Sequence, residues 1–172
     1  MIYVGTSGWS YADWRKRFYP VRLLSRRWLE YYARQFDTVE LNAATYRLPR
    51  EEQITQWCRT VPPGFRFTMK LSRLITHRKT ISPNLERFIF NYVERISSFA
   101  PEKLAQVLCQ LPPYLERDER YLIRFLHMLP ATFRYVWSFG TDRGSRPRWL
   151  RSCGRTTWHS ASMITLGAAR GT

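Results

Sequence analysis

The chain has 172 residues, and its 28 Lys and Arg outnumber its 13 Asp and Glu, which gives a formal net charge of +15 at pH 7. Its content of 44% hydrophobic and 16% aromatic residues excludes an intrinsically disordered protein, and no apolar run approaches the roughly 18 residues of a membrane-spanning helix. Three widely spaced cysteines fit a reducing cytoplasm, so we expect a cytoplasmic protein without a disulfide framework and without a membrane partner.

The first 137 residues alternate between segments of strand and helix character. The strand segments are short and β-rich, whereas the helix segments repeat apolar residues at helical spacing. Prolines help to separate them, and Ser82-Pro83 combines a capping hydroxyl with proline at the first helical position. In chain order, the predicted elements are strand 2–7, helix 23–36, strand 38–42, helix 51–61, strand 65–72, helix 83–99, strand 105–111, helix 122–129 and strand 133–139.

This alternation predicts an α/β fold, because long strand-to-strand connections imply parallel strands and right-handed crossovers. Two architectures are compatible with it, an open doubly wound sheet and a closed (β/α) barrel. The run GTSGWSY at 5–11 does not continue as a GxGxxG helix start, which disfavours a nucleotide-binding Rossmann unit.

The composition changes at about residue 138. Residues 138–172 hold six arginines, one acid and five of the eight glycines, with no lysine and no periodicity. We therefore divide the chain into a patterned domain over 1–137 and an atypical basic tail over 138–172. The tail is either a nucleic-acid arm, because neutralised phosphates release counterions, or a segment that folding constraints did not shape.

Polar side chains share one face of the predicted strands. Over 65–72, apolar residues on one face alternate with Arg66, Thr68, Lys70 and Ser72 on the other. The polar positions gather toward the carboxyl ends of the strands, where both architectures bind their ligands. The positions of interest at these ends are Glu40, Asn42, Lys70 and Gln110.

Glu40 and Lys70 lie on adjacent predicted strands and are natural partners, because a lone desolvated charge costs several kcal/mol. We expect Asn42 and Gln110 to complete their hydrogen bonds. Two interpretations stay open at this point. The pair is either a satisfied polar plug inside a barrel, without any chemistry, or part of a ligand site.

Four blocks of the sequence resemble the domain of unknown function 72 (YecE-like) family. They are GTSGWSY at 5–11 with the following Trp14 and Phe18-Tyr19-Pro20, FDTVELNAATYRLP at 36–49, FRFTMKLSRLITH at 65–77, and VLCQLPP at 107–113. The resemblance implies a TIM-type (β/α) barrel with these blocks at the ends of strands one to four. It implies no established biochemical activity.

The chain departs from the family pattern in two respects. The fifth strand of the family typically ends in a Glu-Phe-Arg-like run, where this chain has Ser138-Phe139-Gly140. A complete barrel needs about 250 residues. We therefore expect an incomplete barrel of about five βα units, in a truncated or frameshifted copy whose tail is out of frame. An unpaired strand edge would make such a copy prone to aggregation.

Aromatic and basic residues near the strand ends are further candidates. The aromatic residues either cover the barrel mouth or form a stacking surface for a sugar or base. The basic residues either hold an anion or form a solvated loop, and His77 titrates where a general base is useful. The two sets are Trp9, Tyr11, Trp14, Phe18 and Tyr19, and Arg73, His77, Arg78 and Lys79.

Three functional hypotheses follow. The first is a barrel-type enzyme for a small anionic or sugar-like substrate, with Glu40, Lys70 and His77 as catalytic residues. The second is a nucleic-acid-binding module, which the charge of +15 favours. The third is a non-functional truncated fragment. The sequence identifies no cofactor and no metal, since it contains no P-loop, no GxSxG elbow and no recognisable metal-ligand spacing. The expected ligand-binding residues are Ser7, Trp9, Tyr11, Asn42, Tyr46, Ser72, Arg73 and Gln110.

Overall fold

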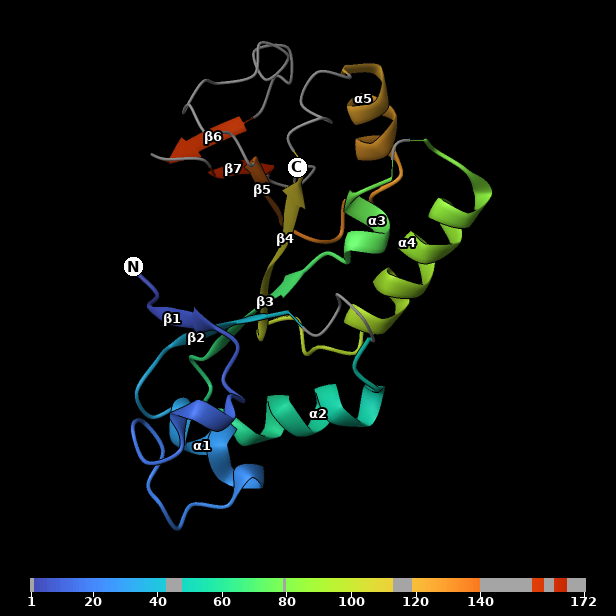
Figure 1. Ribbon diagram of the computed structural model, residues 1–172. Coiled ribbons are helices and arrows are strands. Elements are labelled where there is room, and N and C mark those ends of the chain that lie inside the picture. Colours follow the sequence, from blue (N-terminus) through green and yellow to red (C-terminus); the bar gives the residue numbers. More distant parts are fainter. Residues whose placement is uncertain are drawn as a thin grey trace.

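A computed structural model of the chain describes residues 2–42, 48–78, 80–112, 119–139, 156–159 and 163–166. Its centre is a seven-stranded sheet in the order β1-β2-β3-β4-β5-β7-β6 (Figure 1). The first five strands are parallel, and each of the first four pairs with the next strand in the chain. The prediction of an α/β fold with a parallel sheet is therefore confirmed. These strands are β1 (Gly5–Ser7), β2 (Thr38–Leu41), β3 (Arg66–Lys70), β4 (Leu104–Leu111) and β5 (Tyr135–Phe139).

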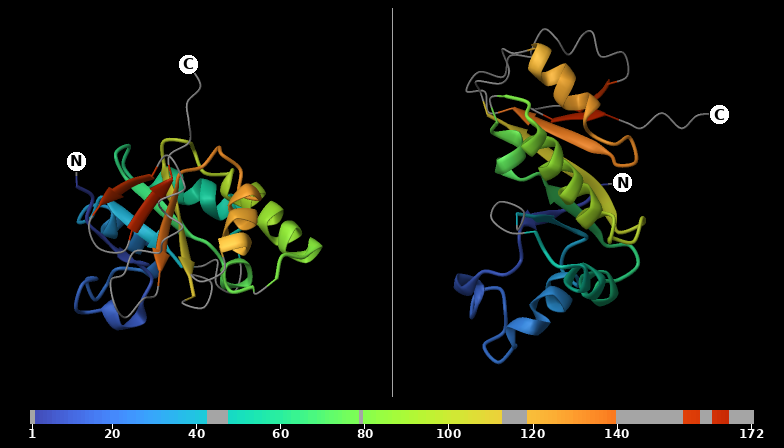
Figure 2. Two further views of the ribbon diagram at one scale, coloured as in Figure 1. Left: turned by 90° about the horizontal axis from the view of Figure 1, so that it is seen from above. Right: turned by 90° about the vertical axis from the view of Figure 1, so that its right-hand side faces the viewer.

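Helices occupy every connection between consecutive parallel strands. The longer ones, α2, α4 and α5, lie along one side of the sheet in Figure 1, and the view from above in Figure 2 (left) shows α4 and α5 beside the strands. The α-helices are α1 (Trp28–Tyr32), α2 (Glu51–Thr60), α3 (Arg73–Thr76), α4 (Pro83–Ile96) and α5 (Glu119–His127). Two short 3-10 helices, η1 (Ala12–Trp14) and η2 (Ser25–Arg27), precede α1.

The hydrophobic core lies between the sheet and these helices. On β3, Phe67 and Met69 are fully buried in it, whereas Thr68 and Lys70 on the opposite face are half-buried. The same alternation continues on the neighbouring strands, where Val107 and Cys109 of β4 are buried. The predicted division of the strands into an apolar and a polar face is thus confirmed, and the polar face points away from the helices.

The predicted start of α4 is also confirmed. The Ser82 side chain accepts a hydrogen bond from the Leu85 amide at 3.4 Å, and Pro83 occupies the first turn. Below this cap, Leu85, Ile89 and Ile96 are buried against the sheet. A capped amphipathic helix of this kind is specified by local sequence, because its cap and its apolar stripe use residues close in the chain.

Four elements have no counterpart among the predicted ones. Two are single turns, η1 and α3. The others are β6 (Thr156–His159) and β7 (Met163–Leu166), and β7 pairs antiparallel with both β5 and β6. Backbone pairing of four-residue strands requires no side-chain periodicity, so a pattern search does not find them. The division at residue 138 and the out-of-frame tail remain predictions.

Within the described residues, no helix is long and apolar enough to cross a membrane.

Candidate functional site

Strands β1, β2 and β3 bring four polar side chains together at their carboxyl ends. Ser7 is in register with Glu40, and its Oγ donates a hydrogen bond to Glu40 Oε1 at 2.9 Å. The Nζ of Lys70 lies 4.0 Å from the same carboxylate oxygen. Asn42 follows β2 directly, and its Nδ2 donates to Ser7 Oγ. We call Ser7, Glu40, Asn42 and Lys70 the strand-end cluster.

The predicted pairing of Glu40 with Lys70 is confirmed. Their side chains are 26% and 25% exposed, so the pair is shielded from solvent without being buried. Ion pairs that water still reaches contribute about 0–1 kcal/mol to stability. The pair therefore orients the Lys70 ammonium more than it stabilises the fold, and one face of the cluster stays accessible.

The turn after β1 fixes the position of Ser7. Gly8 has a φ of +86°, in the left-handed region that glycine favours. Its amide donates to the Glu40 carbonyl at 2.8 Å, which extends the β1–β2 ladder by one bond. The Tyr11 hydroxyl then folds back and donates to the Ser7 carbonyl. The Gly8 amide and the Ser7 carbonyl, the two ends of one peptide group, are thus both hydrogen-bonded.

The chain after β3 supplies the cationic side of the site. Burial, and to a smaller extent the positive charges of Arg73 and Lys70, lower the pKa of His77 below its ordinary value of 6.5. Burial and these two charges therefore favour the neutral form of the imidazole. Its Nδ1 is 2.9 Å from Thr76 Oγ1.

Two other predicted residues have different surroundings from those expected. Ser72 is 6% exposed, and its Oγ accepts a hydrogen bond from the Leu74 amide at 3.2 Å, which makes it the N-cap of α3. Gln110 was expected to complete the hydrogen bonds of Glu40 and Lys70, but it is exposed, and its side chain makes no hydrogen bond within the described residues. The β3–β4 register pairs Lys70 with Leu108, so Gln110 lies two residues beyond the cluster. Tyr46 and Lys79 lie outside the described residues.

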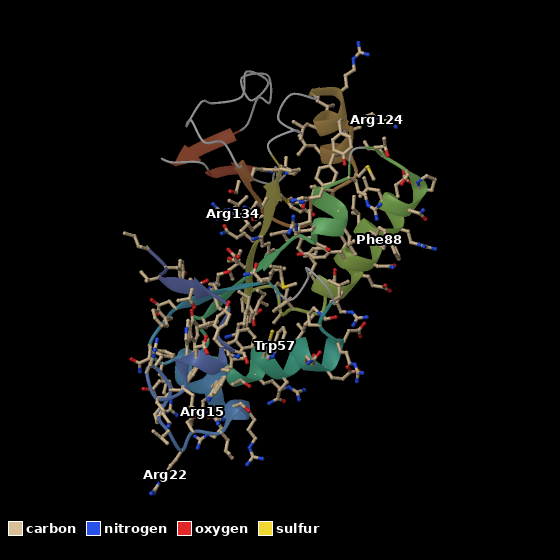
Figure 3. All side chains as sticks on the ribbon, in the orientation of Figure 1. Arg15, Arg22, Trp57, Phe88, Arg124 and Arg134 are labelled. Atoms are coloured by element: carbon tan, nitrogen blue, oxygen red, sulfur yellow. The ribbon has the colours of Figure 1, made fainter. Side chains whose placement is uncertain are left out.

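The aromatic residues after β1 pack against one another and against the helices. The Trp9 ring meets Trp57 of α2 edge-on at 5.2 Å, and Tyr19 stacks on Trp28 at 4.5 Å (Trp57 is labelled in Figure 3). Trp14 and Phe18 are also partly buried against the core. These contacts support the interpretation that the rings staple the loop. Tyr11, 41% exposed, is the most accessible ring of the set.

In the part of the chain that the structure describes, no group of three or more His, Cys, Asp and Glu side chains is arranged to hold a metal ion. The carboxylate of the strand-end cluster instead has a serine hydroxyl and a lysine as partners.

Comparisons with known proteins identify relatives over most of the chain. It is 32% identical over 136 residues to the UPF0759 protein YecE of Escherichia coli (strain K12), a match that covers 78% of this chain and 47% of that protein. It is 31% identical over 120 residues to the UPF0759 protein YunF of Bacillus subtilis (strain 168), covering 67% of this chain and 42% of that protein. The chain thus spans about half the length of the curated relatives it matches.

Solved structures show the same fold. A DUF72 family protein of Thermotoga maritima MSB8 superposes with a TM-score of 0.74 at 29% identity, over 91% of this chain and 63% of that one. A DUF72 family protein of Enterococcus faecalis V583 gives a TM-score of 0.66 at 23% identity, over 88% and 55%, and shows the fold alone. The model of the family described as "Protein of unknown function DUF72" matches residues 3–139, which include β1 to β5 and the whole strand-end cluster. The chain therefore belongs to the DUF72 family, whose function is uncharacterised.

Proposed function

We propose that the strand-end cluster, with Arg73 and His77 beside it, binds a small anionic ligand such as a phosphorylated sugar. The observation that carries this proposal is the charge distribution. Burial, and then the charges of Arg73 and Lys70, lower the pKa of His77, and Glu40 is the carboxylate that pairs with Lys70. An ammonium and a guanidinium form charge-assisted hydrogen bonds with phosphate or carboxylate oxygens.

The architecture around the cluster supports the same proposal. We propose that the five parallel strands form part of a TIM-type (β/α) barrel with the cluster at its mouth. The sequential pairing of β1 to β5, with a helix after each of the first four strands, fits that arrangement. In such barrels the carboxyl ends of the strands are where ligands bind.

If the protein is an enzyme, we propose that residues of the same site transfer a proton. A neutral imidazole can accept a proton from a bound ligand, and the lowered pKa of His77 favours this neutral form. Glu40 would serve as the alternative acid or base, while Lys70 stabilises negative charge. We also propose a cytoplasmic location, which the free thiols of Cys58 and Cys109 support.

The test is calorimetric titration of the chain with inorganic phosphate and with a hexose phosphate. Lys70→Gln is expected to weaken binding at least about tenfold, the usual size of one charge-assisted hydrogen bond. The matched control is Arg66→Gln, which removes the same charge from the same face of β3, four residues nearer its amino end. This control is expected to keep its affinity within about twofold, because Arg66 donates to the carbonyls of Pro63 and Phe65 instead.

Glu40→Gln separates an anion site from a polar plug. Removal of the carboxylate frees Lys70 and removes a repelling charge, so anion affinity is expected to stay the same or to rise. No phosphate binding by the wild-type chain, or equal losses in the Lys70 and Arg66 variants, would contradict the proposed site.

A further inference from the structure

The connection between β1 and α1 carries a concentration of positive charge. Residues 15–27 include six Lys and Arg residues, and no Asp or Glu occurs between Asp13 and Glu30. All six are exposed. We call residues 15–27 the basic loop. Its cations are Arg15, Lys16, Arg17, Arg22, Arg26 and Arg27.

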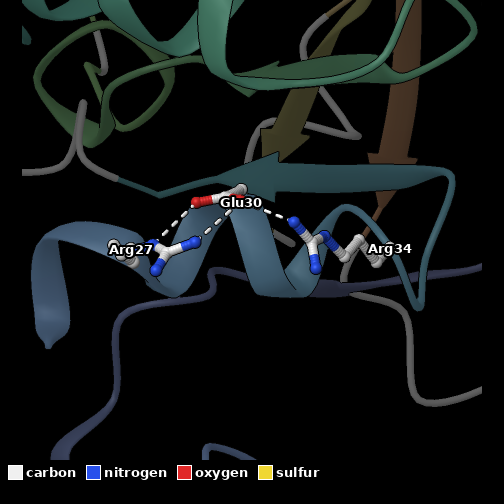
Figure 4. A network of polar contacts seen from close by, with 3 residues as sticks. All are labelled: Arg27, Glu30 and Arg34. Atoms are coloured by element: carbon white, nitrogen blue, oxygen red, sulfur yellow. Dashed lines mark hydrogen bonds and ion pairs between the residues drawn. The ribbon is translucent and has the colours of Figure 1, made fainter. Parts of the chain in front are cut away.

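Two of these cations already have partners. Arg27 Nε donates to Glu30 at 3.0 Å, and Glu30 also accepts from Arg34 at 2.6 Å (Figure 4). The Arg15 guanidinium lies 5.9 Å from the centre of the Trp28 ring. The other four side chains, those of Lys16, Arg17, Arg22 and Arg26, make no hydrogen bond or ion pair within the described residues. Four exposed charges therefore lack an internal counterion in the described part of the chain.

The loop is ordered by its aromatic residues. Tyr19 is 1% exposed, its ring is nearly parallel to that of Trp28 at 3°, and its hydroxyl donates to the Trp9 carbonyl at 2.5 Å. The Lys16 amide closes a tight turn by donating to the Tyr19 carbonyl at 2.9 Å. A partner therefore meets cations on a fixed backbone, which limits the entropy lost on binding. In Figure 3, Arg22 projects from one end of the molecule, and Arg124 lies toward the opposite end.

We propose that the basic loop binds the phosphate backbone of a nucleic acid. Four cations without internal partners suit a chain of phosphates better than a single small anion, because each neutralised phosphate releases a counterion. Five of the six cations are arginine, whose planar fork matches phosphate oxygens. The net charge of +15 attracts the same partner over longer distances. The inference is independent of the small-ligand site, since no residue of the loop belongs to the strand-end cluster.

The test compares two fourfold variants that lower the net charge equally. The loop variant replaces Lys16, Arg17, Arg22 and Arg26 with Gln. The control variant replaces four exposed arginines on α2, α4 and α5 with Gln, namely Arg59, Arg87, Arg120 and Arg124. Binding is measured by fluorescence anisotropy with a labelled RNA oligonucleotide and a labelled DNA duplex over a range of salt concentrations.

The loop variant is expected to bind at least about tenfold more weakly, and the slope of log K against log salt for the duplex falls by about 3 to 4. The control variant keeps its affinity within about threefold. Equal losses in the two variants, or no binding by the wild-type chain, would overturn the proposal. If the fourfold loop variant does not fold, the single changes Arg22→Gln and Arg26→Gln are each expected to lower the slope by about 1.

Anionic membranes are the competing partner, because Val21 and Leu24 of the loop are 63% and 55% exposed. Sedimentation with phosphatidylserine vesicles distinguishes the two. Vesicle binding that the loop variant abolishes, with nucleic-acid binding unchanged, would overturn the proposal in favour of a lipid surface. Two aliphatic side chains offer little apolar area for insertion, so we expect vesicle binding to be weaker than nucleic-acid binding.

Discussion

Gly8 connects the first strand to the strand-end cluster through its backbone alone. The hydrogen bond from its amide to the Glu40 carbonyl continues the β1–β2 ladder. Its φ of +86° turns the chain, and the Tyr11 hydroxyl donates back to the Ser7 carbonyl. A Cβ atom at this position would lie 2.6 Å from the Tyr11 hydroxyl oxygen. Both the backbone conformation and the available space therefore require glycine here.

Gly8→Ala is expected to lower the free energy of unfolding by roughly 1–3 kcal/mol, because the variant combines a strained φ with the displacement of Tyr11. Gly64→Ala is the matched control, since a Cβ there meets nothing within 4 Å. Urea unfolding measures both. Equal stabilities of the two variants would show that the turn does not depend on the left-handed conformation of Gly8.

His77 predicts a dependence of stability on pH. Its pKa is lowered in the folded chain by burial and by the charges of Arg73 and Lys70, so the unfolded chain takes up the proton first as the pH falls. The free energy of unfolding should therefore decrease between about pH 7 and about pH 5, and His77→Gln should remove that part of the decrease. Urea unfolding at both pH values is the measurement. If the free energy of unfolding fell as much in the variant as in the wild-type chain, His77 would not be the titrating group.

At the scale of the elements, the loop between α2 and β3 depends on a residue from a distant part of the sequence. Lys103, just before β4, is 6% exposed. Its Nζ donates to the carbonyls of Val61, Pro62 and Pro63 at 3.5, 2.5 and 3.2 Å. The ammonium thus satisfies three carbonyls at the end of α2 and holds the loop against the start of β4. No motif in the sequence marks this residue.

Lys103→Met is expected to destabilise the chain by about 2–4 kcal/mol, because three carbonyls lose a charged donor while the aliphatic stem is kept. Lys16→Met is the control, since Lys16 is exposed and is expected to change stability by less than about 0.5 kcal/mol. Thermal or urea unfolding distinguishes the two. If the two variants lost similar free energies of unfolding, water would replace the Lys103 ammonium at the three carbonyls without loss of stability.

The elements that the sequence predicts are those specified by local or alternating patterns. The cap and stripe of α4 and the two faces of β3 were predicted from neighbouring residues, and the Glu40–Lys70 pair followed from those faces. The misplaced expectation was Gln110, whose position depends on the β3–β4 register. That register shifts between Phe67 and Thr68, an irregularity that no single strand encodes. The cap formed by Ser72 was also not predicted, because it depends on α3, a single turn with little periodicity of its own.

At the scale of the whole molecule, the sheet has one face covered by helices and one polar face that carries the strand-end cluster. β1 stands at one end of the strand order, and Ile2 and Val4 next to it are 87% and 58% exposed. Such an edge can pair with another strand, which is the basis of the predicted tendency to aggregate. The candidate site includes Ser7 of β1, and the basic loop follows β1 in the chain. The two share no side chain, so their ligands can be tested separately.

The most direct test of the proposed site is a phosphate titration followed by backbone amide chemical shifts of the full chain. The proposed site predicts saturable shifts confined to three segments, residues 7–8, 40–42 and 70–77, which contain the strand-end cluster, Arg73 and His77. Lys70→Gln should abolish these shifts and leave the rest of the spectrum in place. Shifts that are absent, or that concentrate in residues 15–27, would contradict an anion site at the carboxyl ends of β1 to β3.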